Sequence, residues 1–187
     1  AETETTATVE PHPFAAYVRT IGRGSKLSRA LDEDEAAKAM EMILSGAVEP
    51  VQLGAFLLVM RYRKESPAEL AGFVRAARAA FTEGELRAVD LDWPSYADRH
   101  RQLPYFVLAA LLLAENGARV LMHGIAGTGP VTTPAVLAAL GIRPCGSLGE
   151  AGKVLAAGGF AYLPLASFCP ALGQLFALRP LLGVRSP

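Results

Sequence analysis

The chain has 187 residues with 18 basic and 18 acidic side chains, so its formal net charge is +0 at pH 7. Hydrophobic residues make up 51% of the chain, which excludes general disorder, and the neutral balance argues against a protein that coats nucleic acid by bulk charge. The charges are unevenly distributed, because residues 1–50 carry 5 basic and 9 acidic groups whereas residues 102–187 carry 5 and 2. We therefore expect a buried, apolar second half and a first half that holds most of the solvated surface.

Several classes of protein are disfavoured by simple counts. The two cysteines, Cys145 and Cys169, are too few for a disulfide scaffold and are expected to be buried thiols in a reducing compartment. No cluster of Cys, His and carboxylates has metal-ligand spacing. The longest apolar run, residues 103–114, is shorter than the roughly 20 residues of a membrane span. Residues 1–13 are polar and predict a flexible leader, and the expected location is cytoplasmic.

Residues 14–84 predict a small bundle of four short helices. Asp32 with Glu35 has the spacing of a capping box, and Ser66 with Glu69 has the same spacing at the start of the fourth helix. Apolar residues recur at helical spacing in each segment: Phe14, Tyr17, Val18 and Ile21; Ala36, Met40, Ile43 and Leu44; Leu53, Phe56, Leu57 and Met60; Leu70, Phe73, Val74, Ala77 and Phe81. These residues are expected to form the inner faces of the bundle.

Residues 85–187 predict an α/β domain, because strand and helix patterns alternate there and such alternation favours a parallel sheet. The predicted strands are residues 89–92, residues 119–122 leading into His123-Gly124, and residues 160–163. Residues 105–115 are apolar on every side, as in a buried helix. The other predicted helices begin at Thr133-Pro134, at the capping pair Ser147 and Glu150, and near Pro170. The predicted fold class is thus α plus α/β.

Specific segments carry a resemblance to glycosyl transferase family 3, which contains anthranilate phosphoribosyltransferase and the pyrimidine nucleoside phosphorylases. LDEDEAAKAMEMILSGAVEPVQLGAFLLVMRYRKESPAELAGF, residues 31–73, resembles the helical domain of that family. VLMHG at 120–124 resembles a strand ending in Lys-His-Gly-Asn, while ALGI at 139–142 and LRPLLGVRSP at 178–187 resemble later segments. The resemblance implies phosphoribosyl transfer from phosphoribosyl pyrophosphate, magnesium as cofactor and a homodimer. It also implies an α/β domain truncated at its C-terminus, before the acidic pair that binds the metal.

The phosphate-binding segments of the family are changed in this chain. The family's glycine-rich loop corresponds to residues 95–99, which contain no glycine, and Asp98 brings negative charge toward a phosphate. The family's Asn-x-Ser-Thr helix start corresponds to residues 105–108, and the Lys and Asn beside its His-Gly correspond to Met122 and Ile125. We therefore expect phosphoribosyl pyrophosphate to bind poorly.

The remaining candidate ligand-binding positions follow the predicted strands: Ser95, Tyr96, Asp98, His123 and Gly124. His123 either contacts a ligand there or has a structural role. Residues 127–129 are either an anion-binding nest or a plain loop, and residues 98–101 are best interpreted as a solvated turn. No residue is assigned as catalytic or as a metal ligand.

Basic residues gather in the helical segment, and either they contact phosphates or they are ordinary solvated charges. The groups are Arg19, Arg23, Lys26 and Arg29, and then Arg61, Arg63 and Lys64. DWPSYADR together with MHG resembles a divergent branch of the family with degenerate motifs, which implies homodimeric nucleic-acid binders. Three hypotheses follow: a transferase with a degraded phosphate site, a non-catalytic nucleic-acid-binding protein that dimerises through its helical domain, or a scaffold without activity.

Overall fold

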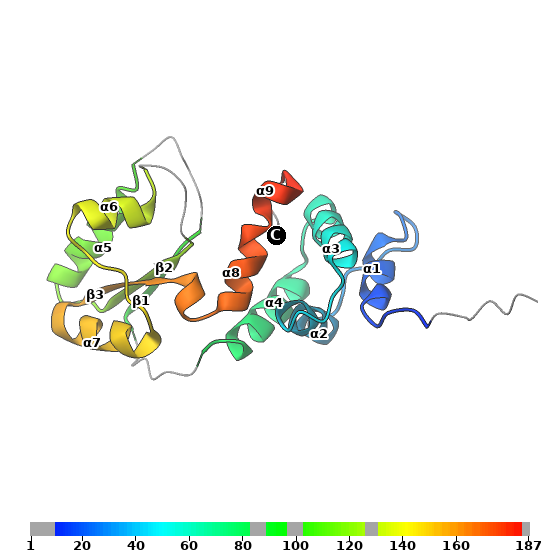
Figure 1. The fold of residues 1–187 in the computed structure, drawn as a ribbon, viewed down its shortest axis with the longest axis horizontal. Helices are drawn as coiled ribbons and strands as arrows, with labels where there is room; N and C mark the ends of the chain where they lie inside the picture. Colours follow the sequence, from blue (N-terminus) through cyan, green and yellow to red (C-terminus); the bar gives the residue numbers. More distant parts are fainter. Residues whose placement is uncertain (1–9, 83–88, 97–102, 126–130, 185–187) are drawn as a thin grey trace, which may run out of the picture. The chain divides into compact units, whose positions relative to one another are not determined.

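The computed structural model describes residues 10–82, 89–96, 103–125 and 131–184 (Figure 1). The chain divides into two compact units, one formed by residues 1–79 with 179–187 and the other by residues 80–178. The boundary predicted between residues 84 and 85 lies outside the described residues. No helix in the described ranges is long and apolar enough to cross a membrane.

The first unit is a helical bundle, as the sequence predicts. Its core contains Phe14, Phe56 and Met60, all essentially inaccessible to solvent, and the rings of Phe14 and Phe56 meet edge to face at 5.3 Å. The capping box at Asp32 is confirmed, because Glu35 N donates to Asp32 Oδ1 and Asp32 N donates to Glu35 Oε2. The helices of this unit are α1 (Ala15–Gly22), α2 (Glu33–Leu44), α3 (Pro50–Arg63), α4 (Pro67–Ala79) and α9 (Arg179–Leu182).

The inner face predicted for α4 is wrong at Leu70 and Val74, although the Phe73 ring does pack against Phe56, with centroids 6.3 Å apart. Leu70 and Val74 are half exposed, whereas the buried residues of this helix are Glu69, Gly72 and Ala76. The physical reason is close packing against α2: a Cβ built on Gly72 would lie 2.3 Å from the backbone oxygen of Glu33. Small side chains allow this approach, so they face α2 while the larger apolar residues turn outward.

The second unit is built on a three-stranded parallel sheet with the order β1-β2-β3, which confirms the predicted parallel arrangement. Alternate strand residues face opposite sides, and helices pack on both faces. Its elements are β1 (Leu91–Ser95), α5 (Phe106–Glu115), β2 (Val120–Gly124), α6 (Thr133–Ala139), α7 (Leu148–Gly158), β3 (Phe160–Pro164), the 3-10 helix η1 (Leu165–Ser167) and α8 (Pro170–Ala177).

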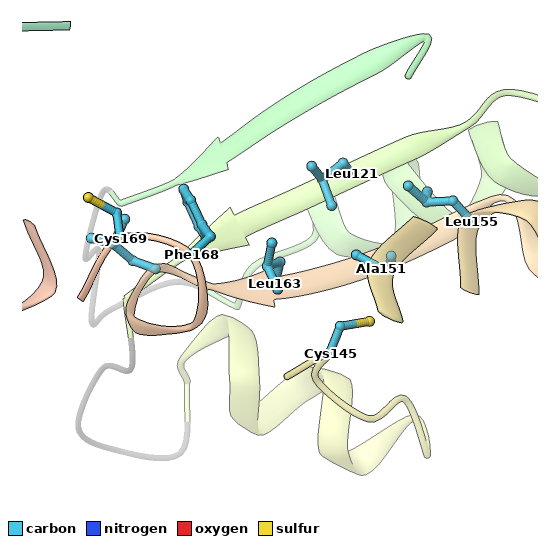
Figure 2. Packing of buried hydrophobic residues seen from close by; sticks show 9 residues of the cluster. Leu121, Cys145, Ala151, Leu155, Leu163, Phe168 and Cys169 are labelled. Atoms are coloured by element: carbon cyan, nitrogen blue, oxygen red, sulfur yellow. The ribbon is translucent and has the colours of Figure 1, made fainter. Parts of the chain in front are cut away.

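Each face of the sheet has its own apolar core. Val120, Met122 and Tyr162 pack against α5 and α6, while Leu121 and Leu163 pack on the other face against α7 and η1 (Figure 2). Cys145 and Cys169 belong to the second of these cores and are free, buried thiols, as predicted. Burial raises the pKa of the Cys145 thiol, so it stays protonated at neutral pH.

Three further expectations need correction. β1 begins two residues later than predicted, because the Asp90 carboxylate is engaged by Arg119, whose backbone N–H donates to Asp90 Oδ2 at 2.8 Å. The sequence pattern takes Thr133-Pro134 as the cap of α6; the helix does begin at Thr133, but its N-cap is Thr132, whose hydroxyl accepts from Ala135 N. The helix α5 is buried on its sheet-facing side alone, and Leu108, Leu112 and Leu113 on the rest of its surface are about half exposed.

Candidate functional site

The carboxyl ends of the three strands form the first candidate site, since ligands of α/β proteins bind at this edge of a parallel sheet. Gly124 ends β2 here, opposite Ser95 at the end of β1. A Cβ on Gly124 would lie 2.5 Å from the backbone oxygen of Ser95, so the close approach of the two strands requires glycine. The glycine of the VLMHG segment therefore has a structural reason that is independent of any ligand.

His123 lies at this edge between two hydrogen-bonding partners. Its Nδ1 lies 2.7 Å from the Tyr96 hydroxyl, and its Nε2 lies 2.8 Å from Asp92 Oδ1. In the neutral tautomer that carries its proton on Nε2, the His123 ring donates to the Asp92 carboxylate and accepts the proton of the Tyr96 hydroxyl at Nδ1. The His123 side chain is only 16% exposed. Both ring nitrogens are therefore occupied by partners within the unit.

Aromatic rings hold this arrangement in place. The Tyr96 ring stacks on Phe176 of α8 with centroids 5.4 Å apart, and Phe168 meets the His123 ring edge to face at 5.7 Å. Burial is the main cause that raises the pKa of Tyr96 above its ordinary value. The Tyr96 hydroxyl therefore stays protonated and acts as a hydrogen-bond donor to His123 rather than as a nucleophile.

Asp92 is not among the candidates that the sequence suggests, although a signal for it exists. In a strand, side chains two residues apart share a face, and β1 pairs with β2 so that Asp92 lies opposite Leu121 and Pro94 opposite His123. Asp92 and His123 are therefore on the same face of adjacent strands. The predicted strand, residues 89–92, contains Asp92, but its approach to His123 becomes visible only once the pairing of β1 with β2 is known.

The other predicted residues of this edge are not gathered around His123. The Ser95 hydroxyl lies 2.7 Å from the Thr133 hydroxyl, and Thr133 is the first residue of α6 on the opposite face of the sheet. Asp98 and the Gly127–Gly129 loop lie outside the described residues. The resemblance implies a polar helix start at residues 105–108, and α5 has no side-chain cap at its N-cap residue Tyr105.

The described residues of this edge do not fit magnesium. Across the described ranges no group of three or more His, Cys, Asp or Glu side chains is placed to hold a metal ion. Asp92 is the one carboxylate described at the strand ends, and it is already paired with His123. Magnesium is bound by carboxylate oxygens together with substrate phosphates, and the described residues of this edge do not supply such a ligand set.

The second candidate site is a hollow in the helical unit. The four predicted basic residues Arg19, Arg23, Lys26 and Arg29 all line it, and its volume is about 560 Å³. Its other lining residues are Ala16, Thr20, Leu27 and Ser28. Residues of α1 and of the glycine-containing turn that follows it are thus brought to one surface.

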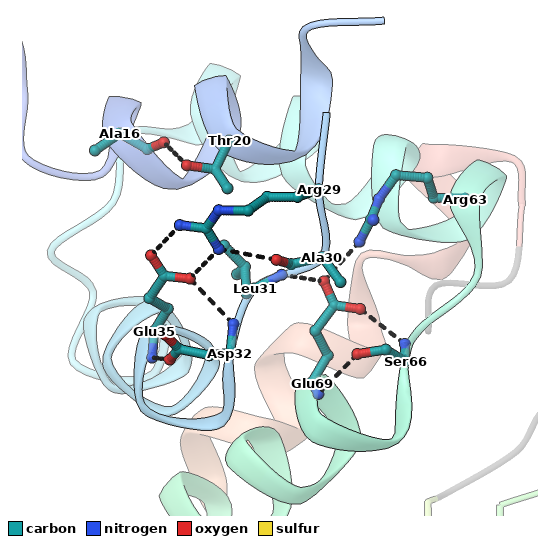
Figure 3. A network of polar contacts seen from close by, with 10 residues as sticks. All are labelled: Ala16, Thr20, Arg29, Ala30, Leu31, Asp32, Glu35, Arg63, Ser66 and Glu69. Carbon is teal, nitrogen blue, oxygen red and sulfur yellow. Dashed lines mark hydrogen bonds and ion pairs between the residues drawn. The ribbon is translucent and has the colours of Figure 1, made fainter. Parts of the chain in front are cut away.

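The four cations of the hollow are not equivalent. Arg29 donates to both Glu35 carboxylate oxygens, at 2.6 and 2.7 Å (Figure 3). This contact lowers the pKa of Glu35 to about 2. Within the described ranges, Arg19, Arg23 and Lys26 make no ion pair with a carboxylate. These three side chains are therefore available to an anionic ligand.

Comparison with known proteins defines the class of this chain. Residues 15–81 match the glycosyl transferase family, helical bundle domain. The uncharacterized protein YbiB of Escherichia coli K12 is 31% identical over 92% of this chain and 55% of its own length. Anthranilate phosphoribosyltransferase of Methylobacterium radiotolerans is 36% identical over 84% of this chain and 46% of its own length.

Solved structures lead to the same class. Anthranilate phosphoribosyltransferase (TrpD) from Thermus thermophilus superposes with a TM-score of 0.75 and 29% identity, covering 84% of this chain and 49% of that one. The Saccharomyces cerevisiae enzyme in complex with PRPP and Mg has the same fold, with a TM-score of 0.73. The chain is a homologue of anthranilate phosphoribosyltransferase and of YbiB, and its N-terminal part is the helical bundle domain of the glycosyl transferase family. It spans about half the length of the relatives it matches.

Proposed function

We propose that this chain uses an anthranilate phosphoribosyltransferase-like fold to bind nucleic acid without transferring phosphoribosyl groups. The observation that carries the proposal is the hollow of the helical unit, where Arg19, Arg23 and Lys26 converge without a carboxylate partner in the described structure. Arginine and lysine side chains bind backbone phosphates and release the counterions that surround them. Arg29 contributes less because Glu35 already occupies its guanidinium.

The edge of the sheet supports the non-catalytic part of the proposal. Its described polar side chains bond to one another: Tyr96 to His123, His123 to Asp92, and Ser95 to Thr133. A pyrophosphate needs free donors, and none of the described residues at the three strand ends is an arginine or a lysine. At these described side chains, a phosphate group would have to break existing hydrogen bonds to bind.

Nucleic-acid binding is tested by fluorescence anisotropy with a labelled DNA of about 20 nucleotides. The triple variant Arg19→Ala, Arg23→Ala, Lys26→Ala is expected to bind at least about tenfold more weakly than the parent chain, because three phosphate contacts are lost. Lys38→Ala, which removes an exposed lysine of α2 outside the hollow, is the matched control and should bind like the parent. Absence of binding by the parent, or equal binding by the triple variant, contradicts the proposal.

Phosphoribosyl transfer is the second candidate, and homology to anthranilate phosphoribosyltransferase is the observation that favours it. Calorimetric titration with phosphoribosyl pyrophosphate and magnesium separates the two functions. We expect no saturable heat at millimolar ligand from a chain that remains folded by circular dichroism. Saturable binding that is lost in His123→Ala would contradict the non-catalytic proposal and favour the transferase.

We also propose that two copies of the chain associate through the helical unit. The support is the apolar face of α4, where Leu70, Ala71 and Val74 line a hollow of about 470 Å³ beside Arg75 and Arg78. A second copy would remove Leu70 and Val74 from water. Sedimentation velocity should show a dimer for the parent and a folded monomer for Leu70→Glu, Val74→Glu. A parent that stays monomeric at high micromolar concentration, or a variant that stays dimeric, contradicts this interface.

A further inference from the structure

The turn between α3 and α4 holds a lysine in a backbone conformation that favours glycine. Lys64 has φ 64° and ψ 148°, and it is the one non-glycine residue with positive φ in the described parts of the chain. A Cβ makes this region unfavourable, so the surrounding structure has to impose it. Strained backbone positions cluster at ligand-binding sites, so this exposed lysine is a candidate for ligand contact.

A buried carboxylate holds the residues on either side of the Lys64–Glu65 pair. Glu69 is 0% exposed, and its Oε1 accepts from Arg63 Nη2 at 2.6 Å while its Oε2 accepts from Ser66 N at 2.7 Å (Figure 3). The residues on either side of Lys64 and Glu65 are thus bonded to one carboxylate. The cap of α4 adds a further bond, from Glu69 N to Ser66 Oγ. The turn is consequently fixed from both ends.

The same carboxylate joins this turn to the basic hollow. Glu69 Oε1 also accepts from Leu31 N at 2.9 Å, and Leu31 follows Arg29 by two residues. Figure 3 shows Arg29 and Arg63 on neighbouring segments above Glu69. The α3–α4 turn therefore borders the segment that carries the cations of the hollow, within one part of the helical unit.

The side chains displayed beside this turn have the composition of a stacking platform. Tyr62 is 90% exposed and makes no ring contact within the described structure. It is flanked in the chain by Arg61 and by the Arg63-Lys64 pair, and both Arg61 and Lys64 are exposed. Aromatic faces bordered by cations bind single-stranded nucleic acid, because unpaired bases stack on the ring while the cations contact the phosphates.

We infer that Tyr62, with Arg61 and Lys64, forms a site for single-stranded nucleic acid in the same helical unit as the basic hollow. A base stacks on Tyr62, and Arg61 and Lys64 bind the adjoining phosphates. This inference rests on the proposed nucleic-acid binding and adds the class of ligand to it. A duplex keeps its bases stacked internally, so it reaches the cations but not the tyrosine.

The stacking of a base on Tyr62 is tested by fluorescence anisotropy, with a labelled single-stranded DNA of about 20 nucleotides and the corresponding duplex. Tyr62→Ala should weaken single-strand binding about tenfold and leave duplex binding unchanged, because loss of one stacked base affects the single strand alone. Tyr105→Ala removes an exposed tyrosine of the α/β unit and is the matched control, with no effect on either ligand expected. Unchanged single-strand binding by Tyr62→Ala, or an equal loss for the duplex, overturns the inference.

The role of Lys64 is tested with Lys64→Gly. This substitution relieves the strain of the positive φ and also removes the cation. The variant should melt at a higher temperature than the parent and yet bind the single strand more weakly, with a salt slope reduced by about 0.7. A higher melting temperature with unchanged binding and slope shows that the lysine is only tolerated there and overturns the inference. If the triple variant of the hollow loses binding while these variants do not, the proposed function stands without this site.

Discussion

At the scale of single residues, two glycines define where backbones meet. Gly124 lets β2 approach the end of β1, and Gly72 lets α4 approach α2. Neither glycine needs positive φ, so the missing Cβ is required by the neighbour rather than by the local conformation. Sequence patterns describe the helices around Gly72 well, but they contain no information about the distance to the partner helix. For that reason helical periodicity places Leu70 and Val74 on the inner face of α4, where the structure has Gly72 and Ala76.

Because α4 lies so close to α2 at Gly72, adding one methyl group there is expected to lower the stability of the helical unit strongly. Gly72→Ala places a Cβ within 2.3 Å of the Glu33 oxygen and within 2.8 Å of the Ala36 Cβ. The two helices have to separate, so the free energy of unfolding should fall by about 1–3 kcal/mol in urea denaturation. Gly54→Ala on α3 is the control, because a Cβ there meets nothing within 4 Å. It should raise the free energy of unfolding by about 0.5–1 kcal/mol. A loss of stability shared by both variants would refute the packing argument.

Glu35 makes the stability of the helical unit depend on acid. The Arg29 hydrogen bond lowers its pKa from 4.5 to about 2 in the folded chain. A lowered folded-state pKa means that the stabilising contribution is present above pH 4.5 and is lost as the pH falls from 4.5 toward 2. The unfolding free energy of Glu35→Gln should therefore decline less over this interval than that of the parent. Glu41→Gln, at an exposed position of the same helix, serves as the comparison. If the unfolding free energy of Glu35→Gln changes with pH as that of the parent does, the Arg29–Glu35 ion pair does not contribute as described.

At the scale of elements, the parts that depend on local chemistry are predictable from sequence and those that depend on register are not. The capping pairs at Asp32 and Ser66 predict correct helix starts, because a cap involves only residues three apart. The sequence pattern begins β1 two residues early, because the ion pair of Asp90 with Arg119 is non-local. The contact of Asp92 with His123 depends on how β1 pairs with β2, which no local pattern contains.

The basic hollow shows the same division between local and non-local information. Its four lining cations, Arg19, Arg23, Lys26 and Arg29, are close in sequence, so their gathering on one surface is predictable. The junction of their segment with Arg63 through the buried Glu69 joins residues far apart in the chain, and no sequence pattern predicts it.

The hydrogen bond from Tyr96 ties the end of β1 to the end of β2, and the ring ties both to α8. Tyr96→Phe keeps the ring on Phe176 and removes the bond to His123 Nδ1. The α/β unit should lose about 1 kcal/mol of stability, as expected for one partly buried hydrogen bond. Thermal unfolding monitored by circular dichroism measures this loss, with Tyr105→Phe at an exposed site as the reference. Equal melting temperatures for Tyr96→Phe and the parent would show that the bond contributes nothing.

At the scale of the whole molecule, a net charge of zero conceals a local excess. The 18 acidic groups neutralise the 18 basic ones over the chain, but only Arg29 of the hollow has a carboxylate partner in the described structure. Because salt screens charges beyond about 10 Å at roughly 0.1 M, a ligand in the hollow experiences mainly the cations that line it. The fold is assigned from the similarity to anthranilate phosphoribosyltransferase. The proposed ligand is assigned from the local charge of the hollow, because proteins with one fold can have different functions.

The salt dependence of DNA binding tests the central proposal most directly. With about three to five phosphate contacts to a single strand, the logarithm of the association constant should fall with the logarithm of salt concentration with a slope of about −2 to −3.5. The variant Arg19→Ala, Arg23→Ala, Lys26→Ala should reduce the magnitude of that slope by about 2, while Lys38→Ala leaves it unchanged. A slope near zero for the parent, or the same slope for the parent and the triple variant, would contradict a nucleic-acid site in this hollow.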